Sequence, residues 1–233
     1  MEINMSIKVP KGRVSTETLP IFLNYCVELS NMVSAYNIQI ESYNTIGVEK
    51  FLSLSLEKQL EILTVMKTYS TQLMEASASK IDLIGDNRKY AWFSMRSMGL
   101  LPPDDLFDKI DEKDMIEVYD AASIQIFRSL ELYRYMSYSF SEIFCFTWMD
   151  LFTRDSFVFK RISETVSQIL SGEISGVYTP NFPVHYAEEI FSNKKIWIKM
   201  QSALMCRLYR IDGSVGGFLH TFKIPEHGSL VKT

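Results

Sequence analysis

The chain has 233 residues, of which 47% are hydrophobic and 22% charged, and its formal net charge is −4. A chain of this length and composition can bury a substantial core, which excludes general disorder and predicts one large or two small domains. The acidic balance argues against nucleic-acid binding, because phosphate recognition requires clustered lysine and arginine.

The cysteines and the apolar runs indicate where in the cell the protein is located. Cys26, Cys145 and Cys206 are widely spaced and form no CxxC pair, which favours buried free thiols over a disulfide framework or a zinc site. Charged residues interrupt every apolar run before it reaches the roughly 20 residues of a membrane span. Residues 1–14 contain no continuous apolar core of a signal peptide. We therefore expect a cytoplasmic protein that binds neither membranes nor nucleic acid.

The first third of the chain has helical periodicity. One helix is expected to begin at residues 15–18, a second after Ser53 or Ser55, and a short aromatic one at residues 88–98, with a break at residues 44–47. Residues 1–102 are thus predicted to form a region of three helices. The apolar stripe of the first helix comprises Ile21, Tyr25, Leu29, Met32, Val33 and Tyr36, and that of the second comprises Leu56, Leu60, Leu63, Met66, Tyr69, Leu73 and Ala76.

These stripes also predict an assembly. Three helices are fewer than the four that usually close a bundle around its own core, and identical stripes can pair across a twofold axis. A symmetric homodimer is therefore expected, and the alternative is packing of the helices over a sheet of the same chain. The proposed interface comprises Ile21, Tyr25, Leu29, Met32, Leu63, Met66 and Leu73.

The composition changes after residue 102. Six carboxylates crowd residues 103–114, which we interpret as an acidic, solvated linker because they lack the spacing of a calcium loop. Residues 115–224 then give two β-prone runs, short helices, a longer helix and further strands, and residues 225–233 form a tail. The fold class predicted for the whole chain is α+β, with an N-terminal helical region followed by an antiparallel sheet with flanking helices.

Three segments of the second region resemble the PAS family of sensory domains. Residues 136–143 (MSYSFSEI) resemble its GYS-x-E-E-hydrophobic motif, and residues 148–155 (WMDLFTRD) resemble its D-L-hydrophobic-H-P-D motif. Residues 196–222 resemble its last two strands, joined by the Asp212-Gly213 turn, which independently favours a hairpin. The sequence departs from the family where Ser137 replaces glycine, where Thr153-Arg154-Asp155 replaces His-Pro-Asp, and in the long segment 177–192.

The resemblance implies a stand-alone sensory module that binds a small ligand or a protein and passes a signal through its helices or a partner chain, such as a downstream signalling protein. It places the ligand between the helix at residues 156–170, which Gly172 is expected to end, and the strands at residues 196–209 and 216–223. Aromatic side chains are expected to line this pocket, although they can equally fill it. The pocket residues named on this basis are Phe144, Phe146, Trp148, Phe152, Phe157, Trp197 and Phe222.

The positions that bind flavin or haem in members of the family hold other residues in this sequence. In its light-sensing branch a cysteine forms a flavin adduct, but Trp148 occupies the matching position and Cys145 falls three residues early. Haem-binding members use a histidine near the long helix, and residues 156–170 contain none. The flavin adduct is therefore disfavoured, haem is unsupported, and any cofactor is left unknown.

Catalytic motifs are missing as well. His185, His220 and His227 lack zinc-site spacing, no GxSxG or phosphate-binding loop occurs, and Glu188 and Glu189 are expected to face solvent. The prediction is a protein that is not an enzyme and holds no metal. Two alternatives stay open, which are a ligand-free structural module for protein–protein interaction and an enzyme of unrecognised type.

Overall fold

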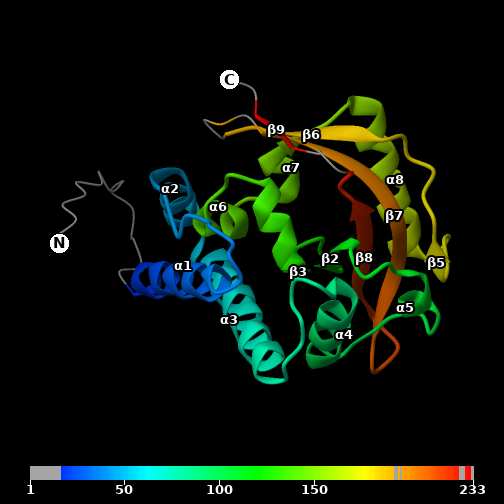
Figure 1. The fold of residues 1–233 in the computed structure, drawn as a ribbon, viewed down its shortest axis with the longest axis horizontal. Coiled ribbons are helices and arrows are strands. Elements are labelled where there is room, and N and C mark those ends of the chain that lie inside the picture. The colour runs from blue at the N-terminus through cyan, green and yellow to red at the C-terminus, as the bar shows by residue number, and fades with distance from the viewer. Residues whose placement is uncertain (1–16, 192–193, 195, 226–228, 232–233) are drawn as a thin grey trace.

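The computed structural model describes residues 17–191, 194, 196–225 and 229–231, and its described part has an α+β fold. Ser15 and Thr16, expected to start the first helix, lie outside these residues, as does most of the predicted tail. The N-terminal helical region comprises α1 (Thr18–Ser34), α2 (Thr45–Ser53), α3 (Leu56–Ala78) and α4 (Asn87–Ser97). Figure 1 shows these helices on one side of a curved sheet.

The expectation of three helices was wrong, because α2 is an additional one. Asn44 was interpreted as part of a break, yet its side-chain oxygen accepts a hydrogen bond from the Gly47 amide at 3.0 Å and caps α2. Asparagine is favoured both in turns and at helix N-termini, because in both places its side chain satisfies a free backbone amide. A polar residue of this kind therefore does not distinguish the end of one element from the beginning of the next.

The buried face of α1 differs from the predicted stripe. Phe22, Cys26, Leu29 and Val33 are buried, whereas Ile21 is 48% exposed. Successive residues of a helix are about 100° apart, and α1 is apolar on more than one side, so periodicity alone allowed either stripe. The ring of Phe22 stacks on that of Phe51 in α2, with centroids 4.0 Å apart, which fixes the face that is used.

The residues named for a homodimer are covered largely within one chain. Helix α1 packs on α3, and four of the seven, Leu29, Leu63, Met66 and Leu73, are buried in the hydrophobic core of the chain itself. The alternative expectation, packing within the chain, thus describes these four residues. A homodimer through the more exposed Ile21 stays a prediction.

The sheet is antiparallel at every described strand pair, as predicted. Its main path runs β3-β2-β8-β7-β6-β4, and β1, β5 and β9 pair with β7. The described strands are β1 (Leu100–Leu101), β2 (Met115–Asp120), β3 (Gln125–Arg128), β4 (Phe152–Thr153), β5 (Val177–Tyr178), β6 (His185–Glu189), β7 (Ile196–Arg210), β8 (Val215–Lys223) and β9 (Ser229–Val231).

The long strand β7 organises the sheet. One of its edges pairs with β9 and β8, and the other pairs in succession with β6, β5 and β1. Strands β7 and β8 form the predicted hairpin at Asp212-Gly213, where Gly213 has a φ of 82° that a side chain would disfavour. Because β1 directly follows α4, the helical region contributes a strand to the sheet.

Short helices connect the strands, and one long helix covers the sheet. They are α5 (Leu106–Lys109), the 3-10 helix η1 (Leu130–Tyr135), α6 (Phe140–Cys145), α7 (Trp148–Leu151) and α8 (Ser156–Ser171). Helix α8 matches the predicted one, and the Asp155 carboxylate accepts from the amides of Phe157 and Val158 at its start. It ends at Gly172, whose φ of 94° is the left-handed conformation expected of a helix stop.

The acidic stretch 103–114, interpreted as a solvated linker, contains α5 and three buried residues. Leu106, Ile110 and Asp114 are at most 2% exposed. The Asp114 carboxylate accepts from the Asp111 amide, and Lys223 of β8 lies 3.5 Å from it. This stretch is therefore packed against the sheet that follows it.

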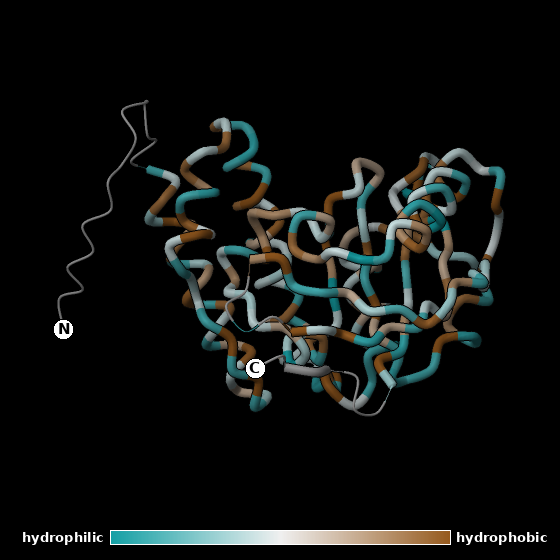
Figure 2. The backbone as a smooth tube through the Cα atoms, turned by 90° about the horizontal axis from the view of Figure 1, so that it is seen from above, coloured by the Kyte–Doolittle hydropathy of each residue, from teal (hydrophilic) through white to brown (hydrophobic). Residues whose placement is uncertain are grey.

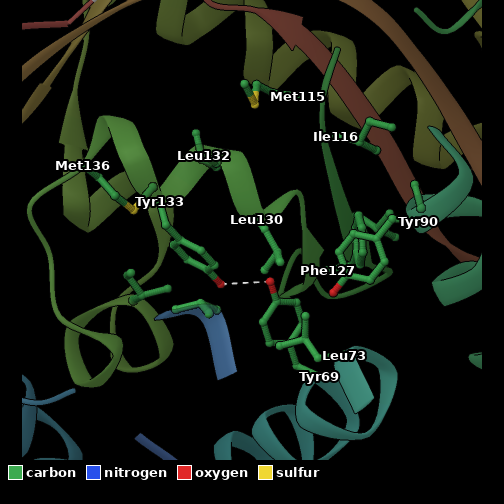
Figure 3. Packing of buried hydrophobic residues seen from close by; sticks show 14 of the residues in the cluster. Tyr69, Leu73, Tyr90, Met115, Ile116, Phe127, Leu130, Leu132, Tyr133 and Met136 are labelled. Atoms are coloured by element: carbon green, nitrogen blue, oxygen red, sulfur yellow. Dashed lines mark hydrogen bonds between the residues drawn. The ribbon is translucent and has the colours of Figure 1, made fainter. Parts of the chain in front are cut away.

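The two faces of the sheet have different coverings. Helix α4 packs against β2 and β3, whereas α8 packs against β7 and β8. Figure 3 shows part of the core that joins the helical region to the sheet, where Tyr69 of α3 points toward Tyr133 of η1. The Tyr69 hydroxyl donates to the Arg128 carbonyl and accepts from the Tyr133 hydroxyl, both at 3.1 Å. One continuous apolar cluster thus links the two regions.

Figure 2 shows apolar and polar residues interleaved along the helices, as expected of elements that bury one face. Within the described residues, we find no helix with the length and apolar character needed to span a membrane.

Candidate functional site

A cavity of about 300 Å³ lies between α8 and the facing side of β2, β7 and β8. Its lining mixes apolar and polar side chains, and Ser163 and Ser167 of α8, which are exposed to solvent, also line it. The apolar lining comprises Ile162, Val166, Leu170, Met200, Met205 and Phe218. The polar side chains of the lining, here called the polar wall, are Glu117, Tyr119, Arg154, His185, Ser202 and His220.

Strand alternation places the polar wall. Side chains alternate between the two faces of a strand, so Glu117 and Tyr119 of β2 share one face while Ile116 and Val118 occupy the other. Glu117 pairs directly with His220 of β8, which puts their side chains on the same face. An irregular register between Ser202 and Leu204 of β7 brings the Ser202 hydroxyl to the same wall.

Glu117 is the most fully satisfied polar group of the wall. Its carboxylate accepts from the Tyr119 hydroxyl at 3.1 Å and from the side-chain Nε2 of Gln125 at 2.8 Å. His220 Nδ1 lies 3.6 Å from Glu117 Oε2, and His220 Nε2 lies 3.2 Å from the Ser202 hydroxyl. Burial alone would raise the pKa of Glu117, but His220 and, at longer range, two arginines lower it below the usual value. Glu117 is therefore an ionised, hydrogen-bonded carboxylate at neutral pH.

Arg154 lies between β4 and α8. Its guanidinium stacks on the ring of Trp148, 3.9 Å from the centroid, and Nη2 lies 3.5 Å from the Met200 sulfur. Its Nε and Nη1 are buried and have no hydrogen-bond partner among the described residues. Burial lowers the pKa of Arg154 to about 10, so it stays cationic at neutral pH.

His185 completes the polar wall from β6. Its Nδ1 lies 3.1 Å from the Pro183 carbonyl, which can only accept, so Nδ1 carries the proton and Nε2 has a free lone pair. Burial lowers the pKa of His185, and the ring is neutral at pH 7. Its Nε2 is buried without a partner in the described part of the chain.

Of the aromatic residues proposed from the sequence, the cavity includes Trp148. Phe152 and Phe222 line a separate void of about 20 Å³, and Phe144 and Phe146 line a groove of about 390 Å³ that extends to α3. Phe157, which is 60% exposed, and Trp197 line an outer groove of about 490 Å³. The structure thus brings Trp148 to the cavity and distributes the other six around it.

Sequence reasoning did not find the polar wall. His220 was considered only as a zinc ligand and set aside for lack of the spacing, and Arg154 was noted only as a departure from the His-Pro-Asp motif. The alternation of Glu117 and Tyr119 with Ile116 and Val118 is a signal that was available, because it predicts a β2 face carrying polar groups. Alternation does not predict which face of β2 is directed toward a helix, or that a cavity lies between them.

The motif residues that carried the resemblance have structural roles. Ser139 and Glu142 cap α6 reciprocally, and the Tyr138 hydroxyl accepts from the Ile190 amide at 2.9 Å and donates to the Leu151 carbonyl. Glu189 was expected to face solvent, and this was wrong. It is 2% exposed and accepts from the Ser137 amide and hydroxyl at 2.7 and 2.6 Å, because β6 runs against the segment before α6.

Comparisons with known proteins give no relative. A scan against protein-family models, a search of curated proteins and a search of solved structures each found no match to this chain.

Proposed function

We propose that the chain is a PAS-type sensory module that binds a small molecule in the cavity between α8 and the sheet. The observation that carries this proposal is the cavity of about 300 Å³ lined by both apolar and polar side chains, between the helix and the strands that the resemblance names. Ligand sites are commonly apolar hollows of this size or larger with a few convergent polar groups. The order of elements, two strands, short helices, a long helix and a final hairpin, also supports the proposal.

The sheet provides a route for the signal. Ligand contacts at Glu117 and His220 lie on one face of β2 and β8, and Ile116 and Leu219 on the other face belong to the core shared with the helical region. A change in these strands therefore reaches the packing of α3 and α4. We propose that a partner chain reads this change at the helices. The three buried thiols, which form no disulfide, support a cytoplasmic location.

Filling the cavity tests the proposal. Val166→Trp places a large ring in the cavity from α8, whereas Gln168→Trp places the same ring on the exposed side of the helix. We expect native mass spectrometry, or thermal shifts with a metabolite library, to reveal binding by the wild type and by Gln168→Trp but not by Val166→Trp. Equal binding by both variants, or no binding by the wild type, would refute the ligand-sensing function.

A second candidate, a serine hydrolase, is favoured by one observation. Ser202, His220 and Glu117 lie in the order of a nucleophile, base and orienting carboxylate, with separations of 3.2 and 3.6 Å. Against it, the Glu117 carboxylate already accepts from Tyr119 and Gln125, and Ser202 lies within the paired strand β7 instead of on a sharp turn. We therefore rank it below ligand binding.

An activity-based probe separates the two functions. A fluorophosphonate labels a serine only if a neighbouring base activates its hydroxyl. We expect no labelling of the wild type beyond that of Ser202→Ala. Labelling that disappears in both Ser202→Ala and His220→Gln would establish the hydrolase instead.

A further inference from the structure

Arg154 is a partly buried cation whose Nε and Nη1 are buried, and no anion among the described residues is bonded to it. The described residues contain no ion pair of Arg154, and the nearby Asp155 carboxylate is used to cap α8. Glu117 acts on Arg154 only through its charge at a distance, and its oxygens accept from Tyr119 and the side chain of Gln125. Burying a charge is costly unless hydrogen bonds compensate for the lost water. Two guanidinium nitrogens of a residue that lines the cavity, Nε and Nη1, thus have no acceptor among the described residues.

The rest of the wall restricts what this acceptor can be. Trp148 holds the guanidinium plane from one side, so the group is oriented before a ligand arrives. Ile162, Val166 and Phe218 are among the apolar side chains that line the cavity, and they favour contact with an apolar body. A carboxylate satisfies the arginine through charge-assisted hydrogen bonds, which are stronger than those to a neutral amide or alcohol.

We propose that the cavity selects small organic monocarboxylates, with the carboxylate on Arg154 and an aliphatic or aromatic body against α8. This inference rests on the proposed ligand-binding function and names the chemical class of its ligand. Polyanions such as nucleotides do not fit it, because Glu117 keeps a negative charge in the same wall.

The experiment compares matched probes by calorimetry. A panel of straight-chain acids of four to ten carbons, with benzoate and phenylacetate, is titrated against the corresponding amides. We expect at least one acid to bind ten times more tightly than its amide. If no acid exceeds its amide, the proposal is overturned, while binding of amides that Val166→Trp removes would leave the ligand-sensing function standing.

Variants of the arginine identify the group responsible. Arg154→Gln should reduce the affinity of the best acid at least tenfold and leave that of its amide within about threefold. Arg154→Lys should restore part of the preference, because it keeps the charge. Arg210→Gln on the exposed end of the same sheet should behave as the wild type.

Two outcomes would contradict the proposal, one by placing the carboxylate in another groove and one by giving Arg154 a purely structural role. Arg154 and His185 also line the outer groove beside β6, so acid binding that survives Val166→Trp would place the anion there and overturn the proposal. If Arg154 only supports Trp148, Arg154→Gln will lower the unfolding temperature of the ligand-free protein without changing the preference for acid over amide. That result would also overturn it.

Discussion

The two faces of the central sheet are covered by different kinds of packing. On the face toward the helical region, Ile116, Val118 and Leu219 are fully buried in one large apolar cluster. On the face toward α8, a smaller cluster surrounds a cavity, and the strands present Glu117 and His220 to it. Close packing favours stability, whereas a cavity with polar groups gives up some stability for space that a ligand can fill.

The largest expected effect comes from truncating the same residue type on the two faces. Ile116→Ala on the packed face should lower the free energy of unfolding by about 3 to 4 kcal/mol, because the surrounding core can close only partly. Ile162→Ala beside the cavity should cost about 2 kcal/mol or less, because its neighbours already lack contacts on that side.

Urea denaturation of both variants measures the difference. Alanine is a better helix former than isoleucine by roughly 0.4 kcal/mol, which lowers the measured cost of Ile162→Ala and must be added back to it. Equal costs after this correction would mean that the two faces are packed alike, and the contrast between them would be lost.

A smaller effect is expected from the tyrosines that join the helical region to the sheet. Tyr69→Phe removes the group that serves both the Arg128 carbonyl and the Tyr133 hydroxyl, and should cost about 1 to 2 kcal/mol because both stay buried. Tyr133→Phe should cost less, since Tyr69 still donates to the carbonyl. Chemical denaturation of the single and double variants checks this, and strictly additive costs would argue against a connected network.

The smallest effect concerns the polar wall and depends on pH. The pKa of Glu117 is lower in the folded chain than its ordinary value of 4.5, so its contribution to stability is present above that value and is lost as pH falls through the folded pKa. We expect the wild type to lose stability relative to Glu117→Gln when the pH is lowered from 6 to 3.5. Parallel unfolding temperatures across this range would show that Glu117 is not stabilised as an anion.

Local chemistry accounts for much of what could be predicted. The hairpin at Asp212-Gly213, the start of α8 at Asp155 and its end at Gly172 depend on residues within a few positions of one another. The same local view failed at Asn44, because a capping side chain and a turn residue look alike. It also failed at Ile21, where only Phe51 from another helix decides which side of α1 is buried.

The sequence by itself determined the α+β class and the antiparallel sheet, since periodicity and turn residues act over short distances. The position of the long helix over the sheet was implied by the resemblance to the PAS family. Only the tertiary structure decided the candidate site. Glu117, Arg154, His185, Ser202 and His220 come from segments up to 103 positions apart, from residue 117 to 220, and no pattern within a segment records their meeting. Tertiary packing also decided that α1 and α3 bury Leu29, Leu63, Met66 and Leu73 within the chain. The physical reason is that a cavity is the space that packing leaves unfilled, and this depends on how all the surrounding elements fit together.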